Sequence, residues 1–312
     1  MKAGNDRRPV LVTGMHRSGT SWLGKMLCAG GDLVNIAEPL NVLNRQTILP
    51  SRVEHWYTYI TDENEDRFLP FYRDAVEFRV HPAHDIAKMR VGSPRDPVKI
   101  LRRWRTFARA RREASLALFR DPFAVFSVDW FRRRLDCRVV VIVREPVAVM
   151  SSLKRLGYLF DFGDLMQQPL LMRERLGRFR SEIDDAVQSP ADIIERGSLL
   201  WKTIYSVVDE YRTAADVCVV RHEDLSRDPV SEFSALYERL QIPFTDRARQ
   251  SIEAFTNSRN PTEVSLSNPF DVRLDSRANL DNWRWRLEPD EVRRIESATH
   301  DCRARYYAGA VT

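Results

Sequence analysis

Residues 10–27, VLVTGMHRSGTSWLGKML, combine residue types and spacing that can bind a phosphate or sulfate group. Apolar residues 10–12 suit a buried strand, Gly14 and Gly19 bracket a tight loop, and apolar residues then return at helical spacing. In a strand–loop–helix unit of this kind, loop N–H groups and the positive end of the helix point at one place. The stretch predicts an anion site. The alternative is an ordinary strand-to-helix turn with an exposed Arg17.

The spacing from Gly14 to Ser21 is that of the nucleoside-triphosphate-binding loop G-x-x-x-x-G-K-[ST], but Thr20 stands in place of the lysine. The positive charge lies instead inside the loop, on Arg17. From there it can approach a bridging oxygen or a transferring group without Mg²⁺ completing the site. The substitution therefore argues against ATP hydrolysis.

The residues HRSGTSW resemble the 5′-phosphosulfate-binding loop of sulfotransferases, which use 3′-phosphoadenosine 5′-phosphosulfate (PAPS) as sulfuryl donor. The resemblance implies a phosphosulfate site formed by Arg17, Ser18, Gly19, Thr20 and Ser21. It also implies that Trp22 stacks on the adenine. The alternative for Trp22 is plain packing, which is the usual role of a tryptophan in the first turn of a core-facing helix.

A second anion motif follows the clearest buried strand, residues 138–143. Arg144 stands at the end of this strand, and Pro146 in the first turn of the next helix. Ligands collect at the carboxyl ends of parallel strands. The segment resembles the 3′-phosphate motif of sulfotransferases, which implies that Arg144 and Ser152 bind the 3′-phosphate of PAPS. The alternative is a salt-bridged arginine and an ordinary helix serine.

A candidate general base follows the predicted second strand, residues 32–36. Cytosolic sulfotransferases often carry a catalytic histidine after the third strand, but this sequence has Arg120, Asp121 and Pro122 there. Glu38 matches the proposed catalytic glutamate of several bacterial and carbohydrate sulfotransferases, so the resemblance implies that Glu38 is the base. Its alternative role is to stabilise the dipole of a helix predicted over residues 40–48. Asp121 is the next candidate carboxylate.

The resemblance extends over most of the chain. Residues 221–225, RHEDL, correspond to a family RYEDL, and residues 283–287 to a late W-x-x-x-L. We expect Glu223 and Asp224 to cap a helix beginning near Pro229 or to form structural hydrogen bonds. Arg277 is a candidate for a contact to the 3′-phosphate from a C-terminal loop.

The elements that must position these residues alternate between strands and helices. Further strands are predicted over residues 116–119 and 217–220, and helices over 98–114, 123–134, 170–187 and 193–213. The alternation predicts an α/β fold with a central parallel sheet of about five strands and right-handed crossovers, like that of the P-loop nucleoside-triphosphate hydrolases. We expect one domain, residues 1–312, with a helical insertion near 50–115. Its aromatic side chains line the acceptor side or simply pack the insertion.

Composition sets wider limits on function. The chain has 312 residues, 43% of them hydrophobic, and a net charge of +5, which suits an anionic cofactor and does not require a nucleic-acid partner. The arginines of residues 102–112 read as a solvated helix face. The four cysteines are scattered and no metal site is expected. No signal peptide or membrane-spanning segment is recognised, so the expected location is cytoplasmic.

The sequence thus predicts transfer of a sulfuryl group from PAPS to a hydroxyl of a carbohydrate, glycolipid or other alcohol, with Glu38 as base and Arg17 stabilising the leaving phosphate. Two alternatives remain open: a P-loop kinase acting on a small molecule, and a non-catalytic protein that binds nucleotides or polyanions. The acceptor's identity and the oligomeric state are not determined by the sequence.

Overall fold

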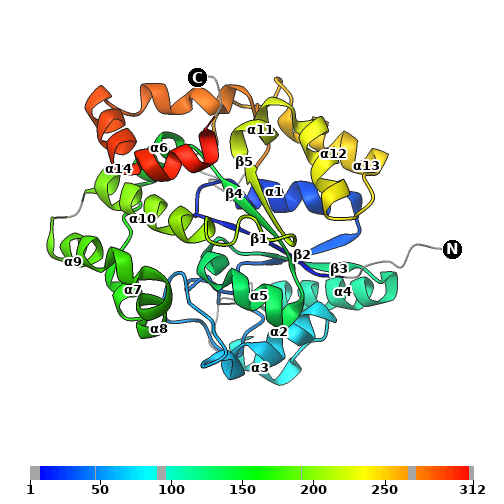
Figure 1. Cartoon of the computed structure of the whole chain (residues 1–312). Helices are drawn as coiled ribbons and strands as arrows, with labels where there is room; N and C mark the ends of the chain where they lie inside the picture. The colour runs from blue at the N-terminus through cyan, green and yellow to red at the C-terminus, as the bar shows by residue number, and fades with distance from the viewer. Residues whose placement is uncertain (1–7, 46, 90–95, 191, 266–271, 309–312) are drawn as a thin grey trace.

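The computed structural model describes residues 8–45, 47–89, 96–190, 192–265 and 272–308. Within these ranges, five parallel strands form one sheet in the order β2-β3-β1-β4-β5 (Figure 1). The strands are β1 (Val10–Gly14), β2 (Leu33–Ala37), β3 (Leu116–Arg120), β4 (Arg138–Val143) and β5 (Val217–Arg221). The predicted α/β fold with a parallel five-stranded sheet is confirmed.

Helices cover both faces of the sheet, as the twofold alternation of side chains along β1 requires. Val10 and Val12 face one apolar cluster, which also contains residues of α1 (Thr20–Leu27), α12 (Pro229–Arg239) and α13 (Asp246–Thr256). Leu11 faces the opposite cluster, built with α2 (Leu69–Val76), α5 (Val128–Leu135), α6 (Pro146–Leu156), α10 (Ile193–Val208) and α14 (Pro289–Tyr307). β1 is therefore buried on both sides.

The order of the strands places one loop at the centre of the molecule. β1 pairs with β3 on one side and with β4 on the other. The connections that leave β1 and those that follow β3 therefore run toward opposite edges of the sheet, which makes the end of β1 a topological switch point. In open parallel sheets, ligands bind outside the carboxyl ends of the strands at such a switch point. The loop from β1 to α1, which carries the predicted anion site, lies at that position.

In the described part of the segment between β2 and β3, bends and turns run to residue 64 and helices follow from residue 65, whereas the sequence pattern predicts a helical insertion from about residue 50. The segment contains η2 (Glu65–Arg67), α2, α3 (Pro82–Met89) and α4 (Asp96–Glu113), and α4 is the predicted basic helix. The segment packs on the rest of the fold through aromatic rings, with Tyr72 contacting Phe119 of β3 and both Trp130 and Phe131 of α5.

One helix prediction is wrong and a second needs modification. The described residues of 40–48, namely 40–45 and 47–48, form turns and bends, because the side chains of Asn41 and Asn44 bond nearby backbone groups: Asn41 Oδ1 accepts from the Leu43 N–H at 2.9 Å, and Asn44 Nδ2 donates to the Glu38 carbonyl at 2.9 Å. Residues 170–187 do not form one helix. The chain runs through α8 (Pro169–Leu171), a π-turn, a 3₁₀ turn starting at Gly177, and α9 (Arg180–Gln188). The segment is helical throughout but is not one regular α-helix, and the change to a 3₁₀ turn comes at Gly177, a residue with low α-helix propensity.

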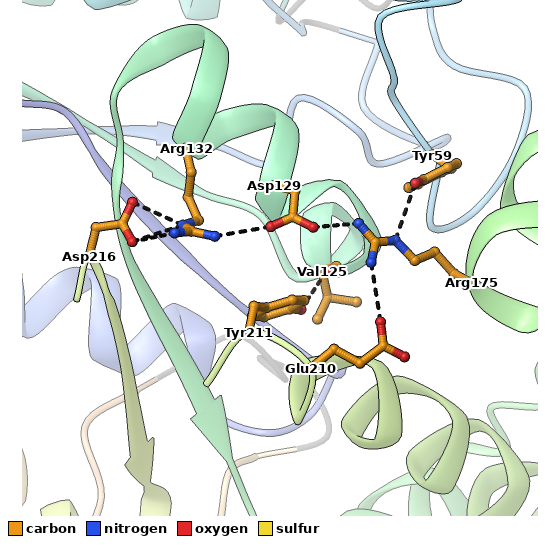
Figure 2. Close-up of polar contacts among 8 residues, drawn as sticks. All are labelled: Tyr59, Val125, Asp129, Arg132, Arg175, Glu210, Tyr211 and Asp216. Carbon is orange, nitrogen blue, oxygen red and sulfur yellow. Dashed lines mark hydrogen bonds and ion pairs between the residues drawn. The ribbon is translucent and has the colours of Figure 1, made fainter. Parts of the chain in front are cut away.

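A chain of ion pairs holds this irregular segment against the sheet (Figure 2). Asp216, next to the start of β5, accepts from Arg132 Nε at 2.9 Å, and Arg132 Nη1 donates to Asp129 of α5 at 3.0 Å. Asp129 also accepts from Arg175, whose Nε donates to the hydroxyl of Tyr59 at 3.2 Å. The network therefore joins the start of β5, α5, the turn after α8 and the loop before α2 (Figure 2).

The remaining helices are η1 (Cys28–Gly30), η3 (Pro122–Ser127), α7 (Gly163–Met166), α11 (His222–Arg227) and η6 (Ala278–Trp285). In the described part of the chain the four cysteines are free thiols. No helix there has the length and apolar character needed to cross a bilayer. No group of three or more metal-ligating side chains occurs among the same residues.

Candidate anion and transfer site

The loop after β1 is tightly closed by its two glycines. A Cβ at Gly14 would lie 2.4 Å from the carbonyl oxygen of Ile142 on β4, and one at Gly19 would lie 2.7 Å from the imidazole of His222. Gly14, Arg17 and Gly19 all have positive φ values (147°, 71° and 106°), a region that glycine adopts without strain. The chain therefore turns sharply into α1, whose first N–H groups have no partners within the helix.

Two tyrosine hydroxyls accept hydrogen bonds from backbone N–H groups of the loop. The hydroxyl of Tyr205 on α10 accepts from the Met15 N–H at 3.3 Å and donates to Ile142 O at 2.9 Å. The hydroxyl of Tyr57 accepts from the next N–H along, that of His16, also at 3.3 Å. Both tyrosines are fully buried. The loop conformation is thus fixed by residues from α10 and from the segment between β2 and β3.

A cavity opens beside the loop, and most of the predicted site residues line it. Arg17 Nε donates to Ser152 Oγ at 3.0 Å, and Arg144 Nη1 donates to the carbonyl of Arg17 at 3.4 Å. The two motifs predicted to bind the two anionic ends of one cofactor therefore meet in one cavity. The predicted residues that line it are Arg17, Gly19, Thr20, Ser21, Trp22, Arg144 and Ser152. Ser18 lies beneath the loop, where its hydroxyl donates to Met15 O at 2.5 Å.

Basic side chains predominate over acidic ones in the described lining of the cavity. Four arginines line it, namely Arg17, Arg144, Arg155 and Arg286, and none of the described residues in its lining is acidic. Burial and the neighbouring charge of Arg155 lower the pKa of Arg17. Burial lowers the pKa of Arg144 to about 10, and Arg17 contributes in the same direction. A lowered arginine pKa means that the charged guanidinium is less favourable in the cavity than in water, and a bound anion would stabilise that charge.

Arg144 has an unpaired donor. Its Nε is buried without a hydrogen-bond partner among the residues that the structure describes. The nearby Glu223 carboxylate is engaged elsewhere, because it accepts from the Glu145 N–H at 3.0 Å and from the Tyr307 hydroxyl at 2.9 Å. A buried guanidinium without a full set of acceptors destabilises the fold unless a ligand completes it.

Trp22 combines both roles considered for it. Its indole is 8% exposed and lies 5.4 Å, centroid to centroid, from the rings of both His222 and Phe233. The ring also forms part of the cavity wall, beside Phe255 and Trp283. It is packed in the core on one side and faces the cavity on the other.

Glu38 lies outside this cavity but is linked to the loop by Arg120. Arg120 Nη1 donates to Glu38 Oε1 at 2.6 Å and to Ser21 Oγ at 2.7 Å. The second oxygen of Glu38 accepts from Asn41 Nδ2 at 2.7 Å. Because turns and not a helix follow Glu38, the helix-dipole alternative for this residue does not apply.

Asp121 is fully buried, and its two oxygens accept from the N–H groups of Leu40 (2.6 Å) and Phe123 (3.0 Å). Burial raises its pKa to about 7, and Glu38 adds to the shift. The folded state therefore binds this proton more tightly than the unfolded chain, whose pKa is about 4.

This shift predicts a pH dependence of stability. The stabilising contribution of protonated Asp121 is complete below pH 4 and is lost as the pH rises through 7, at about 1.4 kcal/mol per pH unit in between. The stability advantage of the wild type over Asp121→Asn should therefore shrink between pH 5 and pH 8. Urea unfolding of both proteins at each pH measures this, and a constant difference would contradict it.

Two predictions for the C-terminal half need correction. Arg277 does not line the cavity, because its Nε donates to the carbonyl of Arg227 at 2.7 Å on the exposed surface. Neither Glu223 nor Asp224 caps α12, since Asp228 takes that position and accepts from the Ser231 N–H at 3.4 Å. The other expectation for Glu223, structural hydrogen bonds, is confirmed by its bonds to Glu145 and Tyr307.

The sequence reasoning missed two arginines of the cavity. Arg155 follows Ser152 by three residues on α6, so helical spacing alone places both on one face. Arg286 lies inside the W-x-x-x-L stretch that was singled out without a role. Both are paired with Glu263, Arg155 at 3.6 Å and Arg286 at 2.5 Å.

Comparisons with known proteins identify the family of the chain. A family model described as "Sulfotransferase family" matches residues 9–246. Carbohydrate sulfotransferase 1 of Danio rerio is 25% identical over 167 residues, which are 51% of this chain and 35% of that protein. The chain thus matches about a third of the length of this curated relative.

Solved structures of similar arrangement include the sulfotransferase domain from the curacin biosynthetic pathway, with a TM-score of 0.48, 14% identity, and coverage of 94% of this chain and 98% of that one. Another is mouse sulfotransferase SULT7A1 complexed with PAP, with a TM-score of 0.46, 11% identity, and coverage of 98% and 90%.

Proposed function

Because the chain belongs to the sulfotransferase family, we propose that it transfers a sulfuryl group from PAPS to a hydroxyl of a carbohydrate, glycolipid or other alcohol. The observation that carries the choice of donor is the buried Arg144, whose Nε has no described partner in a cavity without a described acidic lining residue. A ligand with two separated anionic groups matches the two motifs that meet in this cavity.

The residues fit such a donor at both ends. Arg17, Gly19, Thr20 and Ser21 would hold the 5′-phosphosulfate at the start of α1. Ser18 would support the loop from within, because its hydroxyl and its N–H both donate to Met15 O. Arg144 and Ser152 would bind the 3′-phosphate, and the exposed edge of Trp22 would contact the adenine. Arg277 has no place in this assignment, whereas Arg155 and Arg286 add positive charge to the cavity wall.

In the proposed reaction, Glu38 accepts the proton of the acceptor hydroxyl while its oxygen attacks sulfur in line with the leaving phosphate. Arg17 and the loop N–H groups stabilise the negative charge that grows on that phosphate. Arg120 holds Glu38 and Ser21 together, which supports a base next to the phosphosulfate loop.

We propose that residues 1–312 form one sulfotransferase domain whose acceptor side is the helical segment near residues 50–115. Tyr57 supports this assignment, since it comes from that segment and reaches the loop beside Arg17. The distant relationship to a carbohydrate sulfotransferase favours a sugar among the candidate acceptors. A screen of pooled glycosides and alcohols with labelled PAPS, read by mass spectrometry for an added sulfate, tests the activity.

A thermal-shift comparison separates this function from the kinase alternative. The desulfated product of PAPS, 3′-phosphoadenosine 5′-phosphate (PAP), should raise the melting temperature in EDTA by several degrees at 100 times its Kd. ATP with Mg²⁺ should do little, because Thr20 replaces the lysine that triphosphates require. Stronger stabilisation by Mg-ATP would favour the kinase, and PAP binding without any sulfated product would favour a non-catalytic binding protein.

A further inference from the structure

Two neighbouring residues of the loop send their side chains to opposite sides. Arg17 bonds Ser152 in the anionic cavity. The imidazole of His16 instead lies among three aromatic rings from separate segments, with centroid distances of 6.0 Å to Tyr57, 6.2 Å to Phe123 and 4.7 Å to Tyr158. His16 is thus on the side of the loop where the segment after β2 approaches, and that is the proposed acceptor side.

The hydrogen bonds around His16 assign its tautomer. The Tyr57 hydroxyl accepts from the His16 backbone N–H at 3.3 Å and also lies 2.5 Å from His16 Nδ1. The oxygen of this hydroxyl could accept from both groups, but its hydrogen needs an acceptor as well, and among the described residues His16 Nδ1 is the one in hydrogen-bond contact with it. The hydroxyl therefore donates to Nδ1. A neutral imidazole with Nδ1 as acceptor carries its proton on Nε2.

The ring is neutral, because burial and the adjacent charge of Arg17 lower its pKa to about 3. The side chain is 6% exposed, and Nε2 has no hydrogen-bond partner in the described part of the chain. An unsatisfied buried donor costs about 1–3 kcal/mol, so this N–H calls for an acceptor that the protein itself does not supply.

We propose that His16 is an acceptor-binding residue whose Nε2–H donates to an oxygen of the acceptor next to the hydroxyl that is sulfated. The inference rests on the proposed function and narrows its acceptor to a ring with neighbouring oxygens, as in a sugar. Tyr158, which follows α6, lies 4.7 Å from the imidazole and is more exposed than Tyr57 or Phe123, so it is the ring of the three that an acceptor can contact from solvent. Because Nε2 is buried in the free protein, the side chains around it must rearrange for the oxygen to reach it.

Two substitutions at His16 test the donor. His16→Phe keeps a planar ring without a donor and should raise the KM of a methyl glycoside acceptor about tenfold or more, as expected for one lost hydrogen bond. His16→Gln places an amide N–H near the position of Nε2 and should recover part of the loss. Stabilisation by PAP should be equal in all three proteins. Unchanged acceptor KM in His16→Phe, or an equal loss of PAP binding, would overturn the proposal.

Changing the substrate provides a second test of the same contact. For a deoxy glycoside that lacks the neighbouring hydroxyl, His16→Phe should have no further effect on KM, because the partner oxygen is already absent. Additive losses from the substitution and from the missing hydroxyl would contradict the assigned contact.

Tyr57→Phe and Tyr205→Phe form a matched pair, since each removes a hydroxyl that accepts one loop N–H. Only Tyr57 also bonds the imidazole. If the tautomer matters, Tyr57→Phe should raise the acceptor KM, whereas the effects of Tyr205→Phe should be confined to stability and PAP binding, with the acceptor KM unchanged. Equal effects on acceptor KM would show that both tyrosines merely support the loop.

A measurement without turnover separates this inference from the proposed function. Nitrogen-15 NMR of labelled histidine, with the His16 signals identified by their loss in His16→Phe, should show a neutral Nε2–H imidazole at pH 5. A proton on Nδ1, or a charged ring at that pH, would refute the role of His16 even in an active enzyme. Absence of any sulfuryl transfer by the wild type would instead refute the proposed function.

Discussion

Glu38→Gln should lower turnover by about 10²-fold or more with little change in the KM for PAPS. Glutamine keeps the size of the side chain and one hydrogen-bond acceptor, but it has no basic oxygen to take the proton of the attacking hydroxyl. Because the donor binds on the other side of the loop, through Arg17 and Arg144, its affinity should hardly move. Steady-state kinetics with PAPS varied at saturating acceptor measures both quantities.

The variant also loses part of an ion pair, so a matched control is needed. Glu38 bonds Arg120 and Asn41 through its two oxygens, and glutamine can retain one of these contacts as an acceptor. Glu65 is a comparable carboxylate with partners outside the loop, since it accepts from Arg134 and from the indole N–H of Trp130 at 2.8 Å. Glu65→Gln should lose similar stability, about 1 kcal/mol, with turnover intact.

Near-normal turnover in a less stable Glu38→Gln protein would limit Glu38 to holding Arg120. The base would then be sought at Asp121, which lies next to Arg120 in the chain and is close enough to Glu38 for their charges to interact.

The parts of the fold that sequence predicts well are those fixed by local pattern. The run of β-branched residues at 138–143 is buried on both faces whichever helices cover it, so its strand was predictable. The loop between Gly14 and Gly19 was likewise predictable, because its close approach to Ile142 and His222 tolerates only glycine there. Both motifs of the anion cavity follow such strands directly.

The features that the sequence did not predict depend on side-chain bonds that compete with helix formation, or on contacts between residues far apart in the chain. The apolar spacing of residues 40–48 favours a helix, but side-chain bonds from Asn41 and Asn44 to the backbone win there. Arg277 and Arg286 are nine residues apart in the same C-terminal region. Only the packing of η6 against α6 decides that Arg286 lines the cavity while Arg277 bonds Arg227 outside it.

Because Arg277 lies outside the cavity, Arg277→Ala serves as the control for Arg144→Ala, the second substitution for which we expect a large effect. A guanidinium on a phosphate forms charge-assisted hydrogen bonds that change little between ground and transition state, so the KM for PAPS should rise about 10- to 10²-fold while turnover changes less. Arg277→Ala removes an equal charge from the surface and should leave the KM for PAPS within about twofold. Isothermal titration with PAP gives the same comparison without turnover.

The unliganded stability of Arg144→Ala distinguishes a ligand-binding arginine from a structural one. The Nε of Arg144 is buried without a partner among the described residues, and burial lowers the pKa of Arg144 to about 10, so its charge does not stabilise the free protein. Removing it should therefore change the free energy of unfolding only slightly in the absence of PAP, yet abolish most of the stabilisation that PAP provides. A large loss of stability in the free protein, with the KM for PAPS unchanged, would show that Arg144 serves the fold and that the second anion motif was misread.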